Sequence, residues 1–147
     1  MAFPFSPKAI RVTNNSVFIT YTNGVAPDGS DGKSSTVVQY NMNGSVLNQY
    51  SLLGSNDGLK YDSATGMIWA THNEDGNAFV TLLNPVTGAQ SAQYKFSAAP
   101  HGGGYDDIAF LNGKTYVAAS NPSVDASNHV NGAPSIAAVQ LTGAQGW

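Results

Sequence analysis

The chain has 147 residues, of which 10% are charged, and its formal net charge is −3. The six lysine and arginine residues are scattered, so no basic stripe can neutralise phosphates and we expect no nucleic-acid partner. The absence of cysteine excludes disulfides and thiolate metal sites. No apolar run approaches the ~18 residues of a membrane helix, so we expect no membrane partner.

A unit of about fifty residues occurs three times along the chain. Each copy begins with a short apolar strand, at 9–12, 59–61 and 108–111, and a tight turn follows that strand. A second strand follows and carries one aromatic residue at the same position of each copy, which we expect to be a core position: Phe18, Trp69 and Tyr116. After a loop comes a third strand, at 36–41, 79–84 and 135–141, and a second turn leads to a fourth strand.

The predicted fold class is all-β, with three four-stranded antiparallel units in one domain, residues 1–147. The unit boundaries are expected at about 7–53, 56–98 and 105–147. Residues 143–147 and 2–6 together match the fourth strand of the second unit. We therefore expect residues 2–6 of another copy to complete the last strand of the third unit.

The second strands read as continuous apolar runs, at 17–21, 67–70 and 116–119. Such runs are typical of sheets that are covered on both faces. The blades of a β-propeller stack face to face and meet that condition. A β-trefoil or a β-prism is the alternative, because each is also built from three four-stranded units.

Three segments, 61–69, 84–88 and 107–110, resemble bacterial β-propellers of the NHL-repeat and gluconolactonase-like kind. The resemblance implies that the units are propeller blades. Because propellers have about four to eight blades, we expect two chains to close a six-bladed homodimeric ring. In gluconolactonase-like propellers a metal lies at the channel mouth. The Glu-Gly-Pro start of that family's metal site is absent here, so no family ligand is carried over.

In an antiparallel four-stranded blade, the loop between the second and third strands and the loop from the fourth strand to the next blade lie at the same end. Most acids and all three histidines of this chain lie in or beside these loops. From this end we predict ligand-binding residues His72, Glu74, His101 and Tyr105. Carboxylates suited to Ca²⁺ or Zn²⁺ are predicted at Asp57, Asp106 and Asp107. The competing interpretation is that these acids cap turns by accepting backbone hydrogen bonds. No residue is predicted to be catalytic.

The predicted function is a β-propeller binding or interaction module that uses its acidic, loop-rich end to bind a small molecule or a protein. One alternative is a metal-assisted hydrolase, lactonase or lyase with its site at the channel mouth. Another is a propeller fragment whose main property is self-assembly, or a carbohydrate-binding lectin. The low charge and the Asn-, Ser-, Thr- and Gly-rich composition favour a secreted or periplasmic protein.

Overall fold

The computed structural model describes residues 7–13, 15–26, 31–72, 78–96, 104–119, 123–124, 130–131 and 134–141. Every regular element in these residues is a β-strand, and the strands pair antiparallel, which confirms the all-β prediction. No described segment forms a helix long and apolar enough to cross a membrane.

Three sheets follow one another along the chain. The first sheet has the order β1 (Pro7–Val12), β2 (Ser16–Tyr21), β3 (Ser34–Asn41) and β4 (Val46–Leu53). The second sheet consists of β5 (Asn56–Asp62), β6 (Met67–His72) and β7 (Phe79–Leu83). The third sheet consists of β8 (Asp107–Leu111), β9 (Lys114–Ala119) and β12 (Ser135–Val139). A two-stranded ribbon that the sequence pattern did not predict, β10 (Ser123–Val124) and β11 (Val130–Asn131), lies between β9 and β12.

The second sheet has a partial fourth strand where the repeat predicts one. Val80 and Tyr94 exchange two backbone hydrogen bonds, each with an N···O distance of 2.9 Å. The Ser91 amide also donates to the Leu82 carbonyl. The segment 90–94 therefore runs beside β7 without forming a continuous ladder. The fourth strand expected at 143–147, and residues 2–6 that would complete it, lie outside the described residues.

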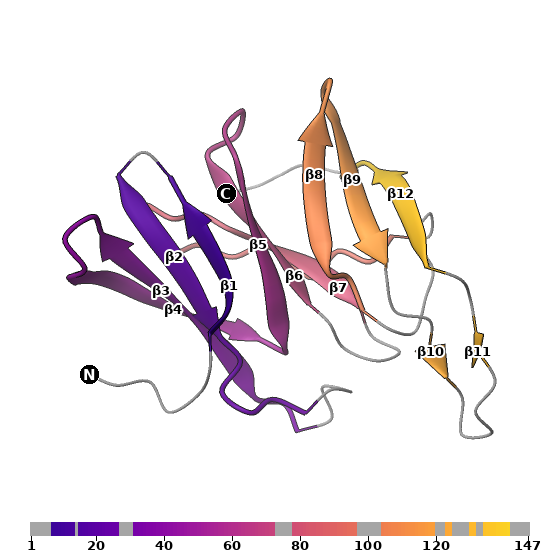
Figure 1. Ribbon diagram of the computed structural model, residues 1–147, viewed down its shortest axis with the longest axis horizontal. Coiled ribbons are helices and arrows are strands. Elements are labelled where there is room, and N and C mark those ends of the chain that lie inside the picture. The colour runs from indigo at the N-terminus through magenta and orange to yellow at the C-terminus, as the bar shows by residue number, and fades with distance from the viewer. Residues whose placement is uncertain are drawn as a thin grey trace.

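Tight turns with positive φ join the strands where glycine and asparagine predicted them. Between β8 and β9, Asn112 has φ 51° and Gly113 has φ 72°, the conformation that an Asn-Gly hairpin turn requires. The turn after β7 ends at Gly88, with φ 77°. We call the end of the sheets that carries these turns the tight-turn end; for β5–β6 and β8–β9 it is the upper end of Figure 1. The opposite end, where the β10–β11 ribbon lies, is the loop end.

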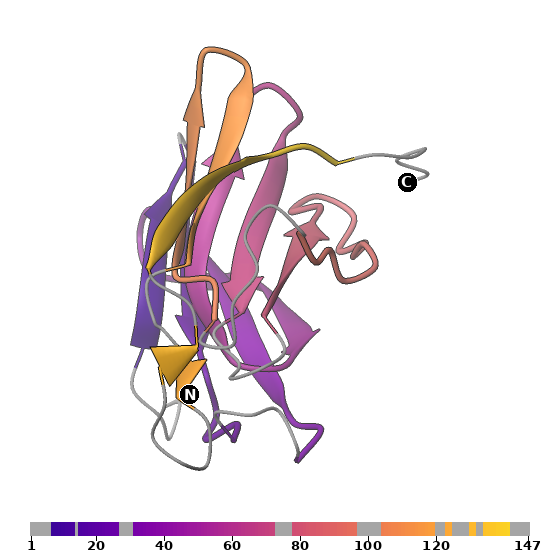
Figure 2. The ribbon, with the colours of Figure 1, turned by 90° about the vertical axis from the view of Figure 1, so that its right-hand side faces the viewer.

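The three sheets stand in a row, with their faces toward one another. They are separate in Figure 1 and overlap in the view turned by 90° in Figure 2. The first strands of the sheets, β1, β5 and β8, are neighbours in that order. The three sheets thus converge at their first strands and stack by their faces.

Two apolar layers fill the spaces between the sheets. The layer between the first and second sheets contains Phe18, Val37, Leu52, Leu59, Ile68 and Leu83. The layer between the second and third sheets contains Trp69, Val80, Leu82, Ile108, Val117 and Ala137. Every position of β6 and β7 is buried, because the second sheet is covered on both faces.

The aromatic positions of the repeat share one orientation. Phe18 faces the second sheet and is 1% exposed, and Trp69 faces the third sheet and is 6% exposed, so both are core residues as predicted. Tyr116 alternates along β9 with the buried Val117, so it lies on the far face of the third sheet, where it is half-buried. No described segment covers that face, which explains the difference from the expected core position.

Candidate functional site

Four predicted site residues lie at the loop end of the sheets. His72 ends β6, Asp57 lies near the start of β5, and Tyr105 and Asp106 precede β8. The Tyr105 amide donates to the His72 carbonyl (3.2 Å), and the Thr71 hydroxyl donates to the Asp106 carbonyl (3.3 Å). The end of β6 is thus hydrogen-bonded to the backbone of the segment that precedes β8. The predicted ligands Glu74 and His101 lie outside the described residues.

His72 is an interior residue, in contrast to the accessible position that the sequence suggested. Its side chain is fully buried and stacks on Phe79, with ring centroids 4.1 Å apart and an interplanar angle of 18°. Both rings stand opposite each other on neighbouring strands. Burial lowers the pKa of His72 to about 3, so the imidazole is neutral at neutral pH. Neither ring nitrogen has a hydrogen-bond partner within the described part of the chain.

Polar side chains are buried with His72 at the loop end of the space between the first and second sheets. The Ser35 hydroxyl donates to the Gly54 carbonyl (2.7 Å) and accepts from the Asn56 amide (2.9 Å). The Asn56 side-chain amide donates to the Thr71 carbonyl (2.7 Å). The Asn56 Oδ1 and the Thr20 hydroxyl have no partner among the described residues. Buried atoms of this kind commonly bind internal water.

Sequence reasoning missed the polar groups that are buried at the same end of the space as His72. Thr20 interrupts the apolar run of β2, which was the one available signal. Asn56 lies beside a register shift in the pairing of β5 with β6, a feature that leaves no mark in the strand pattern.

The three predicted carboxylates do not form a metal centre with the residues described. Asp107 is exposed, lies 3.9 Å from the Lys60 ammonium and accepts a hydrogen bond from the Ile108 amide (2.8 Å). Asp57 and Asp106 are half-buried. Nowhere in the described ranges do three His, Asp or Glu side chains gather closely enough to hold an ion.

Tyr105 is 2% exposed and packs in the layer between the second and third sheets. Its hydroxyl accepts a hydrogen bond from the Phe96 amide (3.2 Å), and burial raises the pKa of the phenol. This residue therefore ties the segment after the second sheet to the start of the third. Because the ring is buried, a ligand in the solvent does not contact it.

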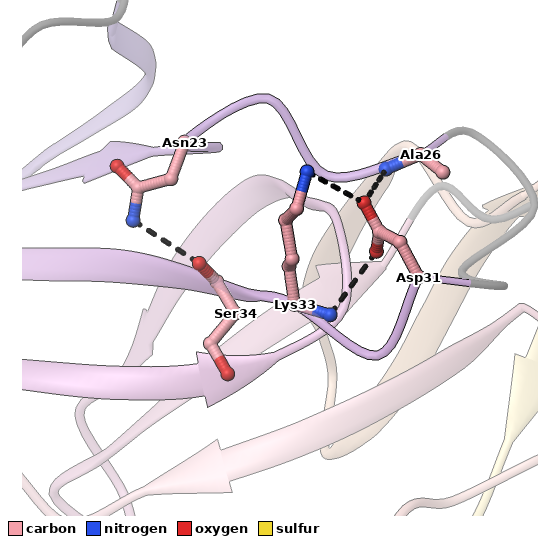
Figure 3. Close-up of polar contacts among 5 residues, drawn as sticks. All are labelled: Asn23, Ala26, Asp31, Lys33 and Ser34. Atoms are coloured by element: carbon pink, nitrogen blue, oxygen red, sulfur yellow. Dashed lines mark hydrogen bonds and ion pairs between the residues drawn. The ribbon is translucent and has the colours of Figure 1, made fainter.

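Asp31 shows how an acid of the loop end acts as a turn cap. Its carboxylate accepts hydrogen bonds from the backbone amides of Ala26 and Lys33, both 3.0 Å long, and lies 3.2 Å from the Lys33 ammonium (Figure 3). These backbone bonds, that of Lys33 first, hold the pKa of Asp31 below its usual value. In the same loop, Asn23 donates to the Ser34 carbonyl (3.1 Å). For Asp31 the capping interpretation describes the geometry.

No protein-family model and no curated protein matches this sequence.

Proposed function

We propose that this protein is an interaction module of the β-propeller type, in which three blades of one chain bind three blades of a second copy in a six-bladed ring. The observation that carries the proposal is the uncovered position of Tyr116, in register with the buried Phe18 and Trp69. Its equivalents in the first two sheets are each covered by the next sheet. A fourth sheet would cover Tyr116 in the same way.

The outer face of the first sheet supplies the complementary surface. Val17 and Ile19 occupy the positions that Ile68 and Ala70 hold in the second sheet, where those residues are buried against the first. In the first sheet nothing described covers these positions. With Tyr40 and Met42 they line a shallow groove of about 310 Å³.

Both end faces expose apolar side chains that water solvates poorly. On the third sheet Ile136 is 77% exposed and Leu111 is 59% exposed. Exposed apolar side chains on this face favour an interaction surface there. A second copy presents the matching face, because the third sheet of one chain would meet the first sheet of the other twice about a two-fold axis.

The ring also supports the predicted role of the loop end. Six loop ends would surround one channel mouth, and loops held by a rigid scaffold are where ligand-binding residues concentrate. The loop end is therefore our proposed surface for a small-molecule or protein ligand.

The test is the mass in solution, measured by sedimentation equilibrium at micromolar concentration. We expect twice the 15.3 kDa chain mass. Ile19→Lys and Tyr116→Asp should each give monomers, because each places a charge in both junctions of the ring. Val86→Asp is the matched control: Val86 is 89% exposed on a turn, and its substitution should leave the dimer intact.

Mixing the two monomeric variants tests the head-to-tail geometry. A mixed pair has one unaltered junction and one junction in which the introduced ammonium of Ile19→Lys faces the introduced carboxylate of Tyr116→Asp. Because these two charges have opposite signs, dimers should reappear in the mixture. A wild-type chain that stays monomeric refutes the ring. A dimer that neither substitution disturbs refutes the assigned faces.

A further inference from the structure

A groove of about 450 Å³ lies between the first and second sheets at the tight-turn end. It is formed by the β1–β2 and β5–β6 hairpins and is lined by Arg11, Val12, Thr13, Asn15, Tyr61 and Ser63. Pockets for small molecules commonly have a volume of about 300–1,000 Å³. No acidic residue lines this groove, and Arg11 is its one charged residue among those described.

Strand pairing directs the side chains of Arg11 and Tyr61 into this space from opposite sides. Arg11 is the cross-strand partner of Phe18, which belongs to the apolar layer between the first and second sheets. Tyr61 is the cross-strand partner of Ile68, which belongs to the same layer. Because cross-strand partners share one face of their sheet, Arg11 faces the second sheet and Tyr61 faces the first. The Nε of Arg11 is buried, as this orientation requires.

Arg11 is the single arginine of the chain, and its guanidinium has no counter-charge within the described residues. The side chain is half-buried, and a guanidinium stays protonated in proteins. Asp62 is close to the groove in sequence, but its carboxylate accepts hydrogen bonds from the Ala64 amide (3.0 Å) and the Thr65 hydroxyl (2.7 Å). A cation that is partly withdrawn from water and unpaired is stabilised by an anion that reaches it.

The second unit shows how the chain itself pairs a cation at the same position of the repeat. Lys60 occupies on β5 the position that Arg11 occupies on β1. Its ammonium lies 3.9 Å from the carboxylate of Asp107, at the start of the next sheet. The position equivalent to Asp107 in the second sheet is Gly58, which has no side chain. The cation of the first unit therefore lacks the carboxylate that its counterpart in the second unit has.

We propose that this groove binds a small hydroxylated carboxylate, whose carboxylate pairs with the Arg11 guanidinium. The planar fork of a guanidinium matches a carboxylate with two parallel hydrogen bonds, and one negative charge balances the one positive charge. The other free polar groups of the lining are uncharged. The Asn15 amide and the hydroxyls of Tyr61 and Ser63 make no hydrogen bond within the described part of the chain, so they suit the hydroxyls of a ligand. The groove lies within one chain, so a monomer and a dimer should each bind one ligand per chain.

The probe is quinate, a carboxylate with several hydroxyls, and its neutral methyl ester is the matched ligand. Titration followed by ¹H–¹⁵N NMR spectra should show saturable shifts with a dissociation constant on the order of 1 mM for a ligand of this size. The Arg11 Nε–H signal should shift along the same binding curve. Methyl quinate should bind about tenfold more weakly, because it cannot form the charge-assisted hydrogen bonds with the guanidinium.

Arg11→Gln should weaken quinate about tenfold, whereas the matched control Lys60→Gln, at the same position of the second unit, should bind as the wild type does. Ser63→Asp provides a second variant in case Arg11→Gln fails to fold. Ser63 is exposed on a turn, and the introduced carboxylate should pair with the guanidinium and abolish binding. Absence of saturable binding, binding that both groove variants leave intact, or an equal loss in Lys60→Gln overturns the site. Equal affinities for quinate and methyl quinate overturn the carboxylate class.

Discussion

The protein should lose stability at mildly acidic pH, and replacing His72 should abolish most of that loss. The folded state holds this imidazole neutral in the interior, with a pKa of about 3 against the ordinary 6.5. The unfolded chain binds the proton at the ordinary value. Between these two pH values the unfolded state holds more protons than the folded state, so a fall in pH favours unfolding.

The magnitude follows from the depressed pKa of His72. Its contribution is fully present above about pH 6.5 and is lost as the pH falls toward 3. Between about pH 7.5 and about pH 5 the free energy of unfolding should fall by about 2 kcal/mol through this group. His72→Leu removes the titrating group and keeps an apolar side chain beside Phe79.

The assay is urea unfolding followed by circular dichroism at the two pH values, at one protein concentration. The difference between the wild type and His72→Leu cancels the contributions of all other titrating groups. We expect the wild type to lose about 2 kcal/mol more than the variant over this interval. Two parallel pH profiles would refute the reasoning, because they would show that His72 is protonated as easily in the folded state as in the unfolded one.

Three further predictions concern packing and are read from urea unfolding. Trp69→Ala should lower the free energy of unfolding by about 3–5 kcal/mol, and a loss under about 1 kcal/mol would contradict its position between two sheets. Gly58→Ala should destabilise by about 1–3 kcal/mol, since a Cβ there would lie 2.6 Å from the Asp106 carbonyl oxygen and would meet the Thr71 hydroxyl; an unchanged stability would show that the sheets separate freely at this point. Tyr50→Phe should cost about 1 kcal/mol, while Tyr61→Phe, whose hydroxyl has no partner in the described residues, should cost nearly nothing; equal effects would remove the Tyr50 hydroxyl from the inter-sheet contact.

Strands and turns could be predicted from the sequence because their signals are local. A positive φ at Gly113 follows from an Asn-Gly pair, and the continuous apolar run of β6 indicates a strand covered on both faces. The register of Phe18 with Trp69 follows from the internal repeat of the sequence. The β10–β11 ribbon has no such signal, since two residues a side are too few to show a period.

The candidate site was predicted less well, because exposure is a property of neighbouring sheets. A histidine that ends a strand beside a loop has the same sequence pattern inside a protein and on its surface. Only the first sheet, standing against the second, buries His72 and the polar groups around it. The acids of the loop end were ambiguous for a related reason, because a carboxylate that caps a turn and one that binds a ligand share the same sequence context.

The sequence by itself determined the repeat, the strands and the shared aromatic position, because backbone geometry and alternation act over a few residues. Only the tertiary structure decided in which copy of the repeat a neighbouring sheet covers the face with the aromatic residue, and in which copy that face is exposed. Tyr116 differs from Trp69 in its surroundings because no described sheet follows the third one. Leu82 borders a cavity between the second and third sheets, whereas Gln39, at the same position of the first unit, accepts a hydrogen bond from the Tyr50 hydroxyl. The neighbours that decide this difference come from strands and turns far apart in the chain.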